Sequence, residues 1–417
     1  MVMIDRIKTM LKADKTKVIL DQAIFSGTSF ITMLILARAL GLYEFGIFAS
    51  VQLYTFLLMS ISGAFVIQPM QVLYGKSLDK SAYIASTIFI QSGAAILMAI
   101  VMLLAYLLAV LFGFSWASIL IPAGAYAIVT IFYDYVRKRL LVEDRLDQLI
   151  IIDALMSFVQ LVIAVLTYFF HLSVDHVLGL MSLGLIPGIM YGVALMSDNF
   201  NLLDIRKYTF EHMTQARWLA PTAIVQWMTS NFFVASSGLY LGVAALGAFR
   251  LVQTLFGLIN ILLQGLESYV LPQAAIRFQR TTDEAYLYLK NLTKRSILPM
   301  GIILGLMFVF ADYIIIWVGG YAYIEYGFVI RWMVILYVFI LINYPVRILI
   351  RLHEMNHLFL FGYILSFVFS LISAHYLLSN HQLIGAIIGL GINQIILFAI
   401  WQYSLNKKEI SLWKSFI

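Results

Sequence analysis

The chain has 417 residues, of which 62% are hydrophobic and only 12% are charged, and it contains no cysteine. Globular proteins are about a quarter charged and roughly half apolar, so this composition excludes a water-soluble fold with a charged surface and predicts an integral membrane protein. The lack of cysteine excludes disulfides, thiolate metal sites and cysteine nucleophiles, and the net charge of +6 does not require a nucleic-acid partner.

The chain opens with a basic segment, 1–17, whose apolar residues recur at helical spacing. This pattern predicts a short amphipathic helix on the cytoplasmic membrane surface, and no signal-peptide cleavage pattern follows it. Apolar runs then recur, each near the roughly 20 residues that a helix needs to cross a bilayer. The predicted runs are 19–40, 45–68, 82–112, 115–136, 149–170, 176–196, 218–240, 246–271, 296–318, 327–349, 358–378 and 383–404. They predict an all-α protein with twelve transmembrane helices.

The basic residues orient this map. With the N-terminus inside, all lysines and arginines except Arg38, Arg250 and Arg331 fall in cytoplasmic segments. Positively charged loops stay on the cytoplasmic side during insertion, so we expect both termini in the cytoplasm. One missed helix would place the later clusters outside, and the pattern therefore supports the count as well as the orientation.

A short break at Gly41–Gly46 joins the first two runs, which predicts an antiparallel pair of spanning helices. The pattern returns half a chain later, where Leu241–Gln253 matches Leu40–Gln52 at six of thirteen positions. A proline, Pro69 or Pro272, is predicted to close the following helix in each copy. We interpret the match as an internal duplication, although short turns in membrane proteins often contain glycine at this spacing.

The duplication predicts two six-helix bundles, 18–196 and 218–404, joined by a cytoplasmic linker, 197–217, and followed by a cytoplasmic tail, 405–417. Each half has an even number of spans, so both enter the membrane from the same side. The predicted symmetry is a pseudo-two-fold axis along the membrane normal.

The sequence carries no nucleotide-binding G-x-x-x-x-G-K-[ST], no H-E-x-x-H metal motif and no G-x-S-x-G nucleophile elbow. The predicted outer loops are also too short to hold the acidic residues of an enzyme acting on lipid-linked sugars. We therefore expect a protein that is not an enzyme and that uses no cofactor or metal.

Ionisable residues within apolar helices are costly and usually face a protein interior or an aqueous cavity. Arg38, Arg250 and Arg331 are predicted to bind an anion in such a cavity, because arginine holds phosphate through paired hydrogen bonds. For Arg38 and Arg331 the alternative is snorkelling to the outer interface, with Glu44 or Glu325 as partners.

The acidic residues offer a second role. Asp153 and Glu267 lie deep in predicted helices and are candidates for coupling a proton or sodium ion. Asp134 and Arg137 stand one helical turn apart and are expected to neutralise each other.

Leu36–Ala49, LARALGLYEFGIFA, resembles the first-hairpin signature of polysaccharide (O-antigen, Wzx-type) flippases in the MATE-like MOP transporter superfamily. Ile314–Leu336 is similar to the connection between the ninth and tenth helices of that family, and Pro345–Asn356 to the basic inner end of its tenth helix. There the family usually has small residues and glycine, whereas this chain has His353-Glu354-Met355-Asn356, which leaves the role of this loop open.

The resemblance implies two six-helix bundles around a basic central cavity. It also implies transport of undecaprenyl-pyrophosphate-linked oligosaccharide from the inner to the outer leaflet of the bacterial cytoplasmic membrane. Arg38 and Arg331 fall inside matched segments, whereas Arg250 is supported only by the internal repeat. Membrane lipids and a polysaccharide polymerase are the expected partners, and nucleic acid is not.

Four alternatives remain. A drug or cation antiporter of the same superfamily would need acidic residues in the cavity. A lipid II flippase commonly carries more than twelve helices. A membrane-embedded glycosyltransferase or polysaccharide polymerase would need larger outer loops, and a non-transporting scaffold is the last alternative.

Overall fold

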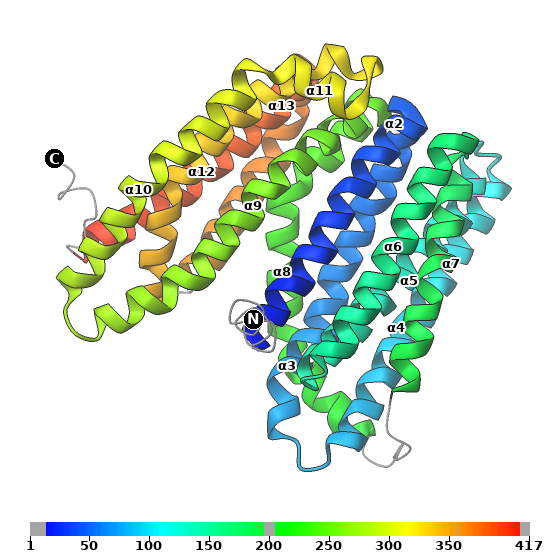
Figure 1. The fold of residues 1–417 in the computed structure, drawn as a ribbon, viewed down its shortest axis with the longest axis horizontal. Helices are drawn as coiled ribbons and strands as arrows, with labels where there is room; N and C mark the ends of the chain where they lie inside the picture. Colours follow the sequence, from blue (N-terminus) through cyan, green and yellow to red (C-terminus); the bar gives the residue numbers. More distant parts are fainter. Residues whose placement is uncertain (1–13, 196–204, 356, 409–417) are drawn as a thin grey trace, which may run out of the picture. The chain divides into compact units, whose positions relative to one another are not determined.

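The computed structural model describes residues 14–195, 205–355 and 357–408, and all regular structure in these ranges is helical. The chain divides into two compact units, Met1–Ile224 and Val225–Ile417 (Figure 1). The predicted surface helix lies almost wholly outside the described residues, as does the predicted tail beyond residue 408.

The first unit opens with a helical hairpin. The helix α2 (Asp14–Ser62) is interrupted at Gly41, whose φ of 69° and ψ of 178° reverse the chain, as Figure 1 shows at the end labelled α2. Gln52 donates to the sulfur of Met33 at 3.4 Å, which joins the two arms of the hairpin. The unit continues with η1 (Gly63–Ile67), α3 (Gln68–Leu73), η2 (Tyr74–Lys76), α4 (Lys80–Leu111), η3 (Ala117–Ile119), α5 (Leu120–Val142), α6 (Leu146–Phe170), α7 (Val174–Ala194) and the start of α8 (Ile205–Leu241).

The second unit ends with a comparable hairpin. The helix α13 (His357–Lys407) reverses at Gln382, and Asn393 on the returning arm donates to the hydroxyl of Ser370 at 2.9 Å. Before it come the rest of α8, then α9 (Val243–Phe278), α10 (Thr282–Val309), α11 (Ala311–Gly319), η4 (Tyr321–Tyr326) and α12 (Gly327–Leu352).

Nine helical stretches of the described residues are long and apolar enough to cross a membrane. Two of them, Leu20–Lys76 and His357–Lys407, fold back at Gly41 and Gln382 and so contain two predicted runs each. The predicted run 218–240 lies in α8, which is not among the nine. The structure therefore supports a multi-span helical fold, and the count of twelve stays a prediction.

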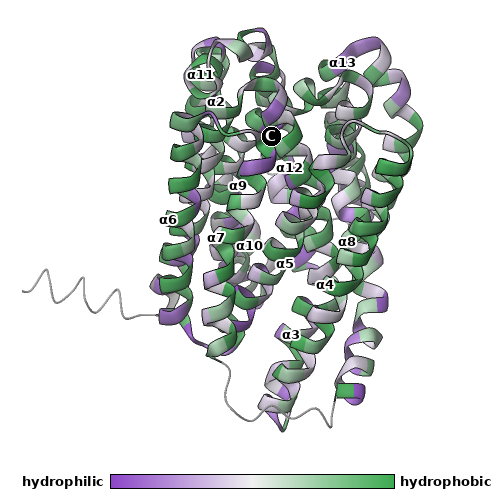
Figure 2. Cartoon of the chain, turned by 90° about the vertical axis from the view of Figure 1, so that its right-hand side faces the viewer, coloured by the Kyte–Doolittle hydropathy of each residue, from purple (hydrophilic) through white to green (hydrophobic). Residues whose placement is uncertain are grey.

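Apolar side chains cover the outer faces of the helices. On α4, Ile100, Leu104 and Leu108 are each about half exposed, and hydrophobic residues dominate most helices in Figure 2. Such faces are unfavourable in water but suit a lipid surrounding. The interior of each unit is also apolar, built on Tyr83, Tyr135 and Val136 in the first and on Leu349 and Trp401 in the second.

The two prolines do not end their helices, so that prediction was wrong. Pro69 lies at the start of α3, immediately after the π-helical turn η1, and helix continues to Leu73. Pro272 lies inside α9, which continues to Phe278. A proline removes one backbone donor, and wider turns such as η1 accommodate that loss within a spanning helix.

The connections that the sequence predicts on the cytoplasmic side are shorter than the apolar runs suggest. α9 ends at Phe278 and α10 begins at Thr282, so only a tight turn separates the two helices. The Thr281 side chain caps α10 by accepting a hydrogen bond from the backbone N–H of Glu284 at 3.2 Å. Likewise α8 begins at Ile205 and runs unbroken through the second part of the predicted linker. Polar ends thus lengthen helices beyond the apolar run that the sequence marks.

The two copies of the repeated pattern adopt the same turn. Gly41 has φ 69° and ψ 178°, and the aligned Gly242 has φ 89° and ψ 164°. This left-handed region is open to glycine at little cost. Gly113, which follows α4, and Gly320, which follows α11, also have positive φ, of 69° and 87°. The shared turns support the duplication.

Candidate functional site

A polar cavity of about 500 Å³ lies within the second unit, between α8, α9, α12 and α13. Eight of its lining side chains are amides, and these are Gln226, Asn231, Gln253, Asn260, Gln264, Asn343, Asn393 and Gln394. The hydroxyl groups of tyrosine, serine and threonine side chains complete the polar surface. Two arginines, Arg250 and Arg347, are present, whereas no aspartate or glutamate is among its lining residues.

The cavity wall follows from helical spacing. On α9 the lining residues Arg250, Gln253, Asn260 and Gln264 recur every three, four or seven positions, which places them on one face of the helix. That face is embedded in an apolar sequence, so it must meet other polar groups or water. The polar stripe of α9 therefore determines where the second unit is hollow.

Hydrogen bonds between helices hold the amides in place. Asn260 of α9 donates to the Tyr337 hydroxyl of α12 at 2.8 Å. Asn343 of α12 donates to a carbonyl of α13 at 3.0 Å, and Asn393 of α13 donates to the carbonyl of Thr229 of α8 at 3.2 Å. Each pairing fixes one side chain. Both amide atoms of Asn393 are engaged, because its Nδ2 also donates to Ser370 and its Oδ1 accepts from that residue.

Arg250 lies on α9 at the cavity, as its predicted role requires. Its Nη1 donates to Gln253 Oε1 at 3.0 Å, which orients the guanidinium group along the helix. Whether this residue binds an anion stays a prediction.

Arg347 is the second cavity arginine, and its partner is the predicted coupling residue Glu267. The Nε of Arg347 lies 3.8 Å from Glu267 Oε1, and the Nη1 of Arg351 lies 2.5 Å from the same oxygen. Tyr344 donates to the other carboxylate oxygen at 3.1 Å. The single buried carboxylate of Glu267 therefore pairs with two arginines, and an excess of positive charge remains around Arg347 and Arg351.

The structure does not bring Arg331 to the cavity. Its Nη2 lies 2.6 Å from Asp312 Oδ2 in a pair exposed to solvent, and Arg331 is not among the cavity's lining residues. Its partner is Asp312 rather than the predicted Glu325. These two residues flank the non-helical turn at Gly320, so their proximity could not be read from helical spacing.

Arg38 lies on α2 of the first unit and is exposed. Its expected partner Glu44 instead accepts a hydrogen bond from the backbone N–H of Val174 at 3.1 Å. A carboxylate at this position caps the first turn of α7 and interacts favourably with the positive end of that helix.

Asp153 is fully buried in a charge cluster of the first unit. Arg137 binds it at two points, with Nε 2.8 Å from Oδ1 and Nη2 2.5 Å from Oδ2. Tyr133 donates to Oδ1 at 2.6 Å, and Asp21 lies 3.4 Å from the same arginine. The expected pairing of Arg137 with Asp134 is therefore wrong, because the arginine turns to carboxylates on neighbouring helices.

The sequence interpretation considered only ionisable residues and so missed the amides, and it assigned Arg347 to the basic inner end of a helix rather than to a cavity. A signal was present, since Gln253, Asn260 and Gln264 continue the face that begins at Arg250. Amides within an apolar spanning segment hydrogen bond across helices, and their periodicity would have located the cavity.

No protein-family model matches the chain, and no curated protein matches it either. Solved structures do. An inward-facing multidrug resistance MATE transporter of the MOP superfamily aligns with a TM-score of 0.70 and 13% identity, covering 95% of this chain and 99% of that one. The lipid II flippase MurJ, in an inward closed conformation, aligns with a TM-score of 0.69 and 12% identity, covering 93% and 86%.

A MOP superfamily transporter from Pyrococcus furiosus aligns with a TM-score of 0.58 and 14% identity, covering 95% of this chain and 97% of that one. These identities are too low to carry a substrate or a mechanism across, but the alignments span nearly the whole chain. The chain therefore has the multi-span helical membrane fold of the MOP superfamily transporters.

Proposed function

We propose that this protein is a flippase that moves undecaprenyl-pyrophosphate-linked oligosaccharide from the inner to the outer leaflet of the bacterial cytoplasmic membrane. The polar cavity of the second unit carries the proposal. It combines two arginines with eight amides and has no carboxylate among its lining residues. A cavity of this chemistry suits an anionic, hydroxyl-rich headgroup rather than a cationic drug.

Each part of the headgroup has matching side chains. Arg250 and Arg347 present planar donors that bind phosphate oxygens in pairs, a geometry that lysine cannot reproduce. Amides and tyrosines both donate and accept hydrogen bonds, as sugar hydroxyls do. The cavity volume of about 500 Å³ falls within the range of about 300–1,000 Å³ usual for ligand sites.

Alternating access supplies the movement. The cavity opens to the inner and then to the outer leaflet, as in transporters built from repeats. Outward movement of an anion is assisted by an inside-negative potential, by about 2.3 kcal/mol per charge per 100 mV. A polysaccharide polymerase on the outer side is the proposed consumer of the product.

The second candidate function is a drug or cation antiporter. It is favoured by the cluster in which Asp21 and Asp153 share one arginine, Arg137, because such a site suits a proton or sodium ion. The same cluster also serves an ion-coupled flippase, with Asp153 as the coupling group. The polar cavity separates the two functions, since it offers no carboxylate to a cationic substrate.

The experiment is complementation in a bacterial strain that lacks this gene. Arg250→Ala and Arg347→Ala are expected to abolish surface polysaccharide at matched expression. Arg331→Ala, whose exposed pair with Asp312 lies outside the cavity, serves as the matched control and is expected to retain it. Full polysaccharide with Arg250→Ala and Arg347→Ala, or increased drug accumulation on deletion, would favour the antiporter.

A further inference from the structure

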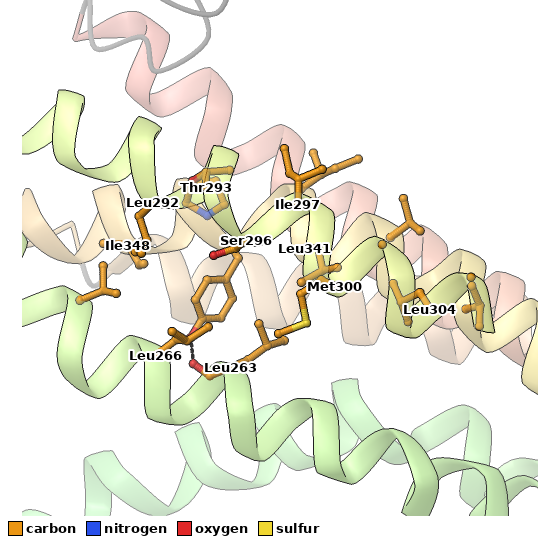
Figure 3. A pocket seen from close by; sticks show the side chains of 18 of the residues that line it. Leu263, Leu266, Leu292, Thr293, Ser296, Ile297, Met300, Leu304, Leu341 and Ile348 are labelled. Carbon is orange, nitrogen blue, oxygen red and sulfur yellow. Dashed lines mark hydrogen bonds between the residues drawn. The ribbon is translucent and has the colours of Figure 1, made fainter. Parts of the chain in front are cut away.

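A second hollow in the same unit differs completely in chemistry. It measures about 680 Å³ and lies between α9, α10 and α12. We call it the apolar groove. Figure 3 shows Leu263 and Leu266 of α9 facing Met300 and Leu304 of α10. Thr293, Ser296 and Tyr344 are the polar side chains among its lining residues.

Two glycines on α10 give the groove its volume. Gly301 and Gly305 stand one turn apart and both line it. A Cβ atom added at either position would meet no atom within 4 Å, so close packing does not require glycine there. Glycine costs a helix roughly 0.5–1 kcal/mol relative to alanine, and here it leaves a space that larger residues would fill.

Tyr344 joins the apolar groove to the polar cavity, because it lines both. Its hydroxyl donates to Glu267 at 3.1 Å and to the backbone carbonyl of Leu263. The aromatic ring is therefore part of the wall that the two hollows share. A ligand that occupied both would be charged and polar on one side of Tyr344 and hydrocarbon on the other.

We propose that the apolar groove binds the hydrocarbon chain of the transported lipid, with the first isoprenoid units beside Tyr344 and the diphosphate in the polar cavity. This proposal rests on the proposed function and adds a second contact to it. Hydrocarbon is the occupant that fits, since the lining is apolar apart from Thr293, Ser296 and Tyr344 and the groove lies along helices of membrane-spanning length and composition.

The internal repeat supplies a matched comparison. The first unit has an apolar hollow of about 500 Å³ between α2, α4 and α5. Ala94 of α4 lines that hollow and is small, as Gly301 is in the apolar groove. None of the lining residues of the first-unit hollow also lines the polar cavity, whereas Tyr344 of the apolar groove does. A site for the hydrocarbon chain next to the headgroup site is therefore expected in the second unit only.

The test compares two ligands, inorganic pyrophosphate and farnesyl diphosphate, on the full chain in nanodiscs of phosphatidylethanolamine and phosphatidylglycerol. Gly301→Phe fills the groove and is expected to weaken farnesyl diphosphate binding about tenfold, since a few buried methylenes are worth this much. Pyrophosphate binding should stay unchanged. Ala94→Phe in the equivalent hollow is expected to change neither ligand, and Arg250→Ala to weaken both.

The outcomes separate the two proposals. Unchanged farnesyl diphosphate binding in Gly301→Phe, with Arg250→Ala still weakening both ligands, would overturn the groove and leave the proposed function intact. Loss of neither ligand in Arg250→Ala would overturn the proposed function. If Gly301→Phe lowers the unfolding temperature, Gly305→Leu replaces it, and the same difference between the two ligands is required.

Discussion

Tyr344 and Glu267 are hydrogen bonded between α12 and α9, with the phenol oxygen 3.1 Å from Oε2 of the carboxylate. The other carboxylate oxygen pairs with Arg351 at 2.5 Å and lies 3.8 Å from the Nε of Arg347. The carboxylate thus occupies the position beside Arg347 that an anionic ligand of the polar cavity would approach. Glu267 acts in this arrangement as an internal counter-charge.

Glu267→Gln is expected to tighten pyrophosphate binding by about tenfold, or ~1.4 kcal/mol, because two arginines then lack their carboxylate. Calorimetric titration of the purified protein measures the effect, and Tyr344→Phe, which keeps the charge, is the control. If Glu267 instead couples a cation, the substitution leaves pyrophosphate affinity unchanged and removes the proton or sodium dependence of transport.

Asp153→Asn is expected to destabilise the first unit. Breaking a buried ion pair costs about 3–5 kcal/mol, and the remaining contact of Arg137 with Asp21 at 3.4 Å favours the lower end of this range. Denaturant unfolding in detergent measures the loss. Asp134→Asn, on the helix of Arg137 but outside the ion pairs of the described residues, should change stability little, and equal effects of the two substitutions would contradict the assignment.

His212 makes stability depend on pH. Its Nδ1 lies 3.3 Å from the Phe65 carbonyl, which only accepts, so Nδ1 carries the proton and Nε2 accepts from the Tyr83 hydroxyl at 2.6 Å. Burial lowers the pKa of His212 from its ordinary 6.5. The folded protein therefore binds this proton less readily than the unfolded chain, and stability falls as pH drops below the ordinary value.

The unfolding temperature should fall between neutral pH and about pH 5, below the ordinary histidine pKa. His212→Gln should flatten this dependence and lower stability at neutral pH. A variant that keeps the full pH dependence would show that another group is responsible.

Glu354 ends α12 in the left-handed conformation, with φ 54°. The N–H of the next residue, Met355, donates back to the Ile350 carbonyl at 3.0 Å, as at helix ends that usually carry glycine. Glu354→Gly is expected to raise the free energy of unfolding by about 0.5–1 kcal/mol, since glycine removes the strain of this conformation. Glu354→Ala should give no gain, and a gain of the same size would indicate that loss of the carboxylate matters instead.

The same loop is the one in which His353-Glu354-Met355-Asn356 replaces the small residues and glycine of the family that the chain resembles. The family resemblance leads one to expect glycine in this inner turn, yet Glu354 adopts the glycine-like conformation and Met355 is buried beside the core. This chain therefore forms the turn without glycine.

Local patterns predicted the fold well. The break at Gly41 and its copy at Gly242 were visible because a left-handed turn selects glycine, and the apolar runs were visible because spanning helices need length. Helix ends were less predictable, since polar residues such as those after Ile205 continue a helix beyond its apolar part.

The site was harder to predict because its contacts join distant helices. Arg250 was recognised from its place in the repeat. Arg331 finds Asp312 across an irregular turn, and Arg137 finds Asp153 on another helix, which sequence spacing does not reveal. Charge alone also hid the amides, whose positions define the polar cavity.

The most direct test of the central claim is translocation in proteoliposomes that contain the full chain and a fluorescent undecaprenyl-diphosphate-linked oligosaccharide. Loss of charge-assisted hydrogen bonds, about 1.5–3 kcal/mol each, predicts that Arg250→Ala slows translocation at least about tenfold, while Arg331→Ala stays close to wild type. Wild-type translocation by Arg250→Ala would contradict the claim that the polar cavity of the second unit binds the lipid headgroup.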